Sequence, residues 1–276
     1  MTVENNPLKQ YFRRPAIYLK LPSGGKSYPD GVINMPESGE LPVYPMTAID
    51  EITTKTPDAL FNGTAIVELI QSCVPNILDP WKISSVDLDA ILIAVKAAAG
   101  GNDLEIVSIC PECKQDAKYG VNLVSLLTTL KSGDYAQELT INELLIKFRP
   151  LTYAEMNKAS IAQFDLQRTI VLLEGITDLD EKNKKSKEAL KTITEVTMQV
   201  LSNTIEYIKT PSAFVDNNNF ILDFLQNCDK NIYEQIKIHN AELKQQTEIK
   251  PLKIKCIACS HEYTQAFTLN TSDFFD

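Results

Sequence analysis

Cys110-Pro111-Glu112-Cys113 and Cys256-Ile257-Ala258-Cys259 contain four of the six cysteines in this 276-residue chain. A Cys-x-x-Cys pair lets two thiolates point at one centre, and two such pairs supply the four sulfurs of a tetrahedral zinc site. Four sulfur ligands leave no open position for a substrate, so this spacing predicts one structural zinc ion per chain and not a catalytic one. The predicted ligands are Cys110, Cys113, Cys256 and Cys259.

The sequence around the two pairs is similar. A strand-like run precedes each pair, at residues 104–109 and 252–255, and apolar residues follow each pair at the same distance. Two strand-knuckle-strand units of this kind form the halves of a zinc ribbon. Lys114 and Ser260 stand after the second cysteine, where many knuckles have glycine, and His261 is interpreted as an exposed turn residue.

The two halves of the predicted ribbon are far apart in the sequence. Closing a loop of about 140 residues costs roughly 4–5 kcal/mol, whereas structural zinc in small peptides contributes ~10–16 kcal/mol. Zinc binding contributes more free energy than loop closure costs. Residues 131–250 are therefore predicted to be a β-hairpin and helical insertion between the two halves. The core, a split zinc-ribbon-like unit, then covers residues 56–130 and 251–276, behind an extended arm of residues 1–55. The predicted fold class is α+β, mainly helical.

Two other uses of the cysteine pairs are less favoured. A disulfide-stapled secreted domain is disfavoured because the first residues show no charged stretch followed by an apolar one. A thioredoxin-type redox pair needs Cys-x-x-Cys at the start of a helix, and no good helical pattern follows either pair. Cys73 and Cys228 lie in apolar helical contexts and are interpreted as buried thiols.

Proline and glycine concentrate near the N-terminus. The first 80 residues contain 10 of the 14 prolines and 5 of the 10 glycines. Because proline fixes φ and removes a hydrogen-bond donor, short extended pieces and turns are expected there. Residues 1–26 also hold five Lys or Arg residues against one carboxylate, in a chain whose formal net charge is −9.

Helical patterns dominate the rest of the chain. Thr56 is a plausible N-cap with Pro57 at the first helical position, and Thr152 and Glu155 form a capping box. A strand is expected over residues 103–109 and a hairpin over residues 137–149. Helices are expected over residues 56–74, 85–99, 152–176, 182–209, 217–227 and 230–247.

Composition argues against several functional classes. No stretch approaches the ~20 apolar residues of a membrane span, and the net charge of −9 argues against a broad nucleic-acid surface. The Gly-Lys-Ser sequence at residues 25–27 lacks the earlier glycine of a phosphate loop, because that position is Lys20. It is interpreted as a turn. With two histidines and no convergent catalytic set, neither a small-molecule substrate nor an enzymatic activity is expected.

Several segments carry a family resemblance. They are residues 13–22 (RRPAIYLKLP), 40–51 (ELPVYPMTAIDE), 55–63 (KTPDALFNG), 72–75, 87–92, 110–113, 148–153 and 256–275. Together they resemble the baseplate (hub assembly) protein family of T-even-like contractile-tailed bacteriophages. The resemblance spans most of the chain and is strongest before residue 130.

The resemblance implies a non-enzymatic late protein that acts in assembly of the baseplate central hub. Either an assembly chaperone or a structural hub component is compatible with these residues. The implied partners are baseplate hub or tail proteins, and the implied location is the host cytoplasm during virion assembly or the tail baseplate of the virion. No catalytic residues follow from it.

Two rival functions remain open. A zinc-ribbon nucleic-acid-binding or transcription-type protein is one, because ribbons often serve there and the basic N-terminal arm offers cations for phosphate. A thiol-disulfide chaperone is a weaker one, based on the two Cys-x-x-Cys pairs alone.

Overall fold

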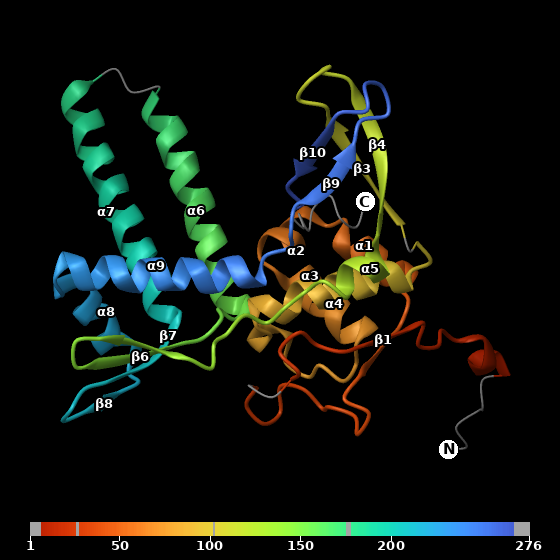
Figure 1. Ribbon diagram of the computed structural model, residues 1–276, viewed down its shortest axis with the longest axis horizontal. Coiled ribbons are helices and arrows are strands. Elements are labelled where there is room, and N and C mark those ends of the chain that lie inside the picture. Colours follow the sequence, from red (N-terminus) through yellow and green to blue (C-terminus); the bar gives the residue numbers. More distant parts are fainter. Residues whose placement is uncertain (1–6, 26–27, 102, 175–177, 268–276) are drawn as a thin grey trace. The chain divides into compact units, whose positions relative to one another are not determined.

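The chain divides into two compact units (Figure 1). The ribbon unit comprises Met1–Pro80, Asp87–Leu130 and Ile249–Asp276, and the helical unit comprises Trp81–Val86 and Lys131–Glu248. Helices and small antiparallel sheets make up both units, as an α+β class requires. The structure is a computed structural model that describes residues 7–25, 28–101, 103–174 and 178–267.

Short pieces build the N-terminal part of the ribbon unit. The 3-10 turn η1 (Pro7–Tyr11) precedes strand β1 (Ile17–Leu19), which pairs antiparallel with β2 (Leu41–Val43). The side chains of these strands that enter the core are Leu19, Leu41 and Val43. Extended pieces were predicted here, but the helix α1 (Ala48–Thr54) was not. The predicted turn at residues 25–27 falls partly outside the described residues.

Helices α2 (Pro57–Phe61) and α3 (Thr64–Cys73) replace the single helix that was predicted before Pro75. Gly63 separates them with a φ of 82°, a left-handed conformation that glycine adopts without a steric penalty. The prediction missed the break because the apolar residues keep their helical spacing on both sides of it.

Helix α4 (Ser85–Ala98) confirms the predicted buried helix of this region. Six consecutive side chains from Ala90 to Val95 are buried, so the helix is enclosed on all sides along this stretch. Gly100 follows with a φ of 106° and ends it, as a glycine beyond a helix C-terminus commonly does.

Two β-hairpins complete the ribbon unit. Strand β3 (Asp103–Ile109), confirmed with its predicted bounds, pairs antiparallel with β4 (Asp116–Asn122), and helix α5 (Leu123–Leu127) follows. Strand β9 (Leu252–Lys255) pairs antiparallel with β10 (Glu262–Gln265). The hairpins are separate two-stranded sheets. The last residues of the predicted core, 268–276, lie outside the described residues.

A four-stranded antiparallel sheet in the order β5-β6-β7-β8 forms one layer of the helical unit. Its first two strands, β5 (Glu138–Ile141) and β6 (Leu144–Phe148), confirm the predicted hairpin. The sheet packs against helices α8 (Asn218–Asn227) and α9 (Lys230–Thr247), both near their predicted bounds. The buried core residues are Ile141, Ile146, Phe148, Leu201, Ile205, Ile208, Ile221, Leu225, Ile236 and Leu243.

The helix predicted over residues 182–209 was wrong at its C-terminal end. Helix α7 (Leu179–Asn203) ends at its C-cap Thr204, and the following residues form strand β7 (Ile205–Lys209), with the two-residue β8 (Phe214–Val215) beside it. Ile205 and Ile208 fit the helical stripe of α7, but they are buried in the sheet. Pairing with β6 therefore outweighed the helical pattern.

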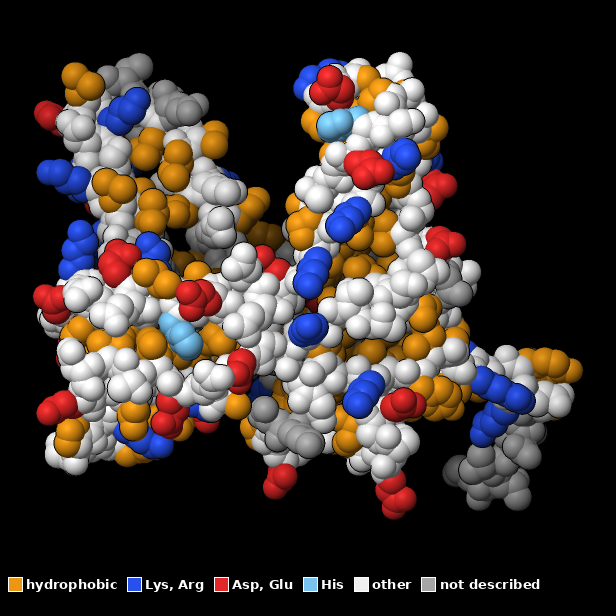
Figure 2. All heavy atoms as spheres, viewed as in Figure 1, with side chains coloured by type: hydrophobic (Ala, Val, Ile, Leu, Met, Phe, Trp, Pro, Cys, Tyr) orange, Lys and Arg blue, Asp and Glu red, His pale blue; other side chains and the backbone are white. Residues whose placement is uncertain are grey.

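Helix α6 (Tyr153–Glu174) runs beside α7, with hydrophobic side chains visible between the two (Figure 2). Its capping box is confirmed: the Thr152 backbone N–H donates to Glu155 Oε2 at 2.9 Å, and the Glu155 N–H donates to Thr152 Oγ1 at 3.3 Å. The end predicted for this helix, near residue 176, lies outside the described residues. No helix in the described part of the chain is long and apolar enough to span a membrane.

Candidate metal centre

The first Cys-x-x-Cys pair forms a tight knuckle between β3 and β4. The Cys110 N–H donates to the Gln115 carbonyl at 2.9 Å, and the Lys114 N–H donates back to the Cys110 carbonyl at 3.0 Å. Lys114 has a φ of 61°, in the left-handed region that favours glycine. This turn directs both thiols of the pair to one side.

The second pair repeats the same turn between β9 and β10. The Cys256 N–H donates to the His261 carbonyl at 2.8 Å, and the Ser260 N–H donates to the Cys256 carbonyl at 2.9 Å. Ser260 also has a φ of 61°. The two knuckles thus have the same hydrogen bonds at the same offsets, and each accepts a strained non-glycine residue at the position where the sequence lacks glycine.

The structure brings all four predicted cysteines together. Their sulfur atoms lie within 4.8 Å of one another. Cys110 Sγ is 3.7 Å from Cys259 Sγ, and Cys113 Sγ is 3.6 Å from Cys256 Sγ, so each close pair joins the two knuckles. Disulfide sulfurs would be about 2.05 Å apart. Four sulfurs placed 2.3 Å from one central ion would be about 3.8 Å apart, and the observed spacing fits that arrangement.

The electrostatics of the cluster also suit a cation. The backbone N–H of Cys259, aided by that of Ala258, lowers the pKa of the Cys256 thiol to about 6. The backbone N–H of His261 lowers the pKa of Cys259, but burial and hydrogen bonds to the other three thiols outweigh it and raise that pKa to about 12. The negative charge of one thiolate therefore makes ionisation of the neighbouring thiols harder. A divalent cation among the sulfurs would offset this repulsion and favour the thiolate form of all four.

Polar contacts join the two hairpins beside the sulfur cluster. The buried Ser108 on β3 donates from its Oγ to Gln265 Oε1 on β10 at 3.0 Å, and the Tyr263 hydroxyl donates to Ser108 Oγ at 3.0 Å. Sequence analysis did not identify these three residues. Ser108 could have been found, because it lies two residues before Cys110 on one extended run and therefore points to the same side. Tyr263 and Gln265 could not, because the knuckle turn separates β10 from Cys259.

One comparison with known proteins identifies the family. The family described as "T4 bacteriophage base plate protein" matches residues 15–276, nearly the whole chain. The chain belongs to this family. A structural role in the baseplate of a T4-like phage, among other baseplate and tail proteins, follows from that membership. No curated protein and no solved structure matches the chain.

The side chain of Arg13, a cation of the basic arm, forms hydrogen bonds and an ion pair within the baseplate protein. Its guanidinium donates to the Pro45 carbonyl at 2.6 Å and to the Ser72 carbonyl and hydroxyl, both at 2.8 Å. It also forms an ion pair with the buried Asp50 at 3.4 Å. This cation therefore anchors the N-terminal segment to α1 and α3 and is not free to bind phosphate.

Asp87 and Cys73 of the baseplate protein have structural explanations. Asp87 is fully buried; its carboxylate accepts the Ser23 N–H at 2.9 Å and the Tyr28 hydroxyl at 2.6 Å, and it also accepts the Ser23 hydroxyl. Burial raises the pKa of the Cys73 thiol to about 11, which makes it an unreactive core residue. Cys228, predicted to be buried, is only partly so.

Proposed function

We propose that this protein is a non-enzymatic component of the central hub of a phage baseplate, acting in hub assembly as a chaperone or as a structural subunit. The family match over residues 15–276 carries the proposal. The resemblance of residues 13–22 and 40–51 to hub assembly proteins supports the more specific hub role. Its partners are then hub or tail proteins, met in the host cytoplasm during virion assembly or in the tail baseplate.

The proposal includes one structural zinc ion held by the four clustered thiols. An all-sulfur, tetrahedral set favours zinc over hard ions such as magnesium or calcium. The ion would supply cohesion and no reaction chemistry, because four protein ligands fill its coordination sphere. The matching turns of the two knuckles support this role, since they orient all four sulfurs without side-chain rearrangement.

The described polar groups support a binding role over a catalytic one. The buried Asp87 and the partly buried Arg13 are engaged in bonds that fasten loops to the ribbon unit. A general acid or a nucleophile would need access to a substrate.

Co-expression with the other hub and tail proteins of the same phage tests the function. We expect at least one of them to co-purify with the chain through size-exclusion chromatography. Cys256→Ser should weaken that complex, whereas Cys228→Ser, which changes a thiol outside the cluster, should not. Failure of every hub and tail protein to co-purify with the wild-type chain would overturn the proposal.

The nucleic-acid rival keeps two supporting observations, the exposed lysines of β9 and the exposed cations Lys9, Arg14 and Lys20 of the N-terminal segment. A filter-binding titration with mixed DNA and RNA separates the two functions. A phosphate-binding protein must lose affinity for nucleic acid steeply as the salt concentration rises, whereas the hub proposal expects no tight complex at physiological salt.

Titration with a thiol reagent tests the thiol-disulfide chaperone function, which requires activated cysteines in the metal-free chain.

A further inference from the structure

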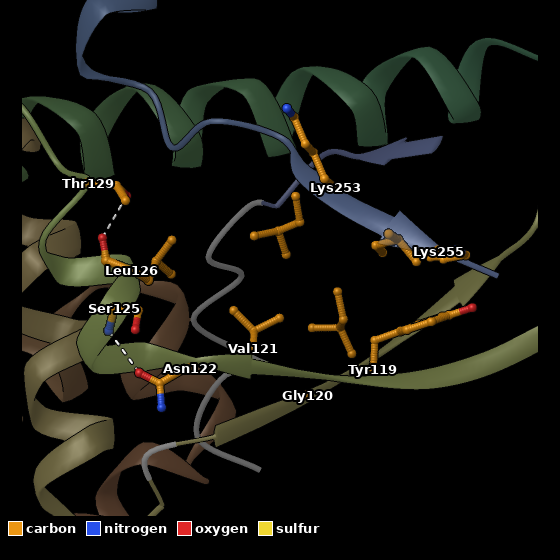
Figure 3. Close-up of a pocket in the computed structure, with 12 residues that line it drawn as sticks. Tyr119, Gly120, Val121, Asn122, Ser125, Leu126, Thr129, Lys253 and Lys255 are labelled. Carbon is orange, nitrogen blue, oxygen red and sulfur yellow. Dashed lines mark hydrogen bonds between the residues drawn. The ribbon is translucent and has the colours of Figure 1, made fainter. Parts of the chain in front are cut away.

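A cleft of about 380 Å³ separates the two hairpins of the ribbon unit. The last four residues of β4, 119–122, line one side of the cleft. All four residues of β9, 252–255, line the other side. Successive side chains of a strand point to opposite faces. Walls formed by consecutive residues therefore include the backbone of both strands, while Ile106 of β3 extends the lining over the face of the first hairpin. Figure 3 shows β4 and β9 passing on either side of this space.

The free edge of β4 can be identified from the ladder. The Cys110 N–H bonds to the Gln115 carbonyl, and hydrogen-bonded pairs alternate with non-bonded pairs along an antiparallel ladder. By that alternation, Lys118 and Gly120 point their backbone N–H and carbonyl groups away from β3. Gly120 has no side chain to shield them, and a Cβ built there would meet no atom within 4 Å.

The free edge of β9 follows in the same way. The Cys256 N–H bonds to the His261 carbonyl, so Ile254 and Leu252 fall in the hydrogen-bonded pairs with β10. Lys253 and Lys255 then point their backbone groups away from β10. Within the described part of the chain, neither β4 nor β9 pairs with a strand outside its own hairpin.

The side chains around the cleft indicate what kind of peptide fits. Ile106, Val121 and Ile254 supply apolar surface, and Figure 3 shows Val121 pointing from β4 into the space. Lys253 and Lys255 are exposed and alternate along β9 with the buried Ile254, and Figure 3 shows the Lys253 amine pointing away from the space between the strands. Basic side chains lie beside hydrophobic ones on the hairpins in Figure 2. Lys253 makes no ion pair with any described residue, and Lys255 is 3.9 Å from Glu262.

We propose that this cleft binds an extended, acidic segment of another baseplate protein by strand addition. The free backbone groups of β4 and β9 supply the main-chain hydrogen bonds, and the apolar floor accepts every second side chain of the segment. Lys253 and Lys255, on the other face of β9, select carboxylates at the alternate positions, whose side chains lie on that same face. Lysines also protect sheet edges from unwanted pairing, but that role alone leaves the bare backbone of Gly120 unexplained. The inference rests on the proposed function for the identity of the partner.

Synthetic peptides test the cleft without any other baseplate protein. Three series of fluorescein-labelled hexapeptides, in which Val, Ile or Leu alternates with Glu, Ser or Lys, are titrated against the full zinc-loaded chain by fluorescence anisotropy. We expect saturable binding that is tightest for the Glu series and weakens with salt. The same peptides with N-methylated backbone amides should not bind, because they lack the donors that a strand requires.

A matched pair of variants locates the binding. Lys253→Pro and Lys253→Thr both remove the charge, but only proline removes the outward N–H, and neither affects a hydrogen bond of the β9-β10 ladder. We expect Lys253→Pro to bind the best peptide about tenfold more weakly than Lys253→Thr. Equal affinities for the two variants, binding of the N-methylated peptides, or no binding in any series would overturn the proposal. Such failures would leave co-purification with hub proteins, and hence the proposed function, unaffected.

Discussion

The Sγ atoms of Cys113 and Cys256 lie 3.6 Å apart although the two residues are 143 positions apart in the sequence. The contact joins two hairpins that share no strand pairing. The hairpins also meet through polar contacts of Ser108 with Gln265 and Tyr263 and of Tyr119 with Tyr263 and the Ile257 backbone. Because the sulfur cluster adds a further link between the hairpins, its loss should destabilise the ribbon unit first.

Removing one sulfur should remove the metal and loosen the ribbon unit. We expect elemental analysis to find about one zinc per wild-type chain and far less in Cys256→Ser. The thermal unfolding midpoint should fall by about 10 °C, since loss of a structural metal costs several kcal/mol. Cys228→Ser is the control and should keep its zinc. Equal stability of Cys256→Ser and the wild-type chain would contradict a structural metal at this cluster.

Replacing a left-handed knuckle residue by glycine should stabilise the folded chain. Lys114 and Ser260 both have a φ of 61°, which costs a residue with a Cβ about 1–2 kcal/mol. We expect Lys114→Gly to raise the free energy of unfolding by about 0.5–1 kcal/mol, after the entropy that glycine adds to the unfolded chain. Gln115→Gly, at a neighbouring position without positive φ, should lower it. Chemical denaturation measures both, and the prediction is wrong if the two changes have the same sign.

The two neighbouring arginines of the N-terminal segment should behave differently. Arg13→Ala removes the bonds to Pro45 and Ser72 and leaves the buried Asp50 without its cation. We expect a loss of about 1–3 kcal/mol in the free energy of unfolding. Arg14 is exposed, so Arg14→Ala should change it by less than about 0.5 kcal/mol. Denaturant titration of both variants is the measurement, and similar losses would show that Arg13 is not an anchor.

The stability of the helical unit should depend on the ionisation of Glu155. Burial opposes ionisation, but the Arg149 guanidinium, at 2.6 and 3.0 Å, and the Thr152 N–H outweigh it and hold the pKa of Glu155 below its usual 4.5. A carboxyl group whose pKa is lower in the folded chain stabilises it above pH 4.5 and loses that contribution as the pH falls through the folded value. Unfolding of the wild-type chain should therefore become easier below pH 4.5.

Two variants separate this effect from general acid denaturation. Glu155→Gln should be less stable than the wild-type chain at pH 7, and the difference should shrink as the pH falls below 4.5. Glu181→Gln, which removes an exposed partner of Lys185, should change little at either pH. A constant gap between Glu155→Gln and the wild-type chain from pH 7 to pH 3 would exclude the ionised Glu155 as its source.

Local sequence patterns were sufficient for elements whose determinants lie within a few residues. The capping box of Thr152 and Glu155, the bounds of α9 and the strand leading into Cys110 all depend on side chains and backbone groups close in the chain. The two Cys-x-x-Cys spacings likewise predicted that four sulfurs meet, because that chemistry has few other uses.

Elements that depend on residues distant in the sequence could not be predicted from local sequence patterns. Ile205 and Ile208 continue the apolar stripe of α7, and only the edge of β6 beside them makes a strand the better structure. The sequence shows Arg13 only as one cation of the basic N-terminal arm. The structure shows that its guanidinium donates to the carbonyls of Pro45 and Ser72. The cleft between β4 and β9 likewise cannot be predicted from the sequence, because it exists only where two hairpins that are far apart in the sequence lie beside each other. A residue's neighbours along the chain set its local conformation, whereas burial and pairing depend on groups that folding brings together.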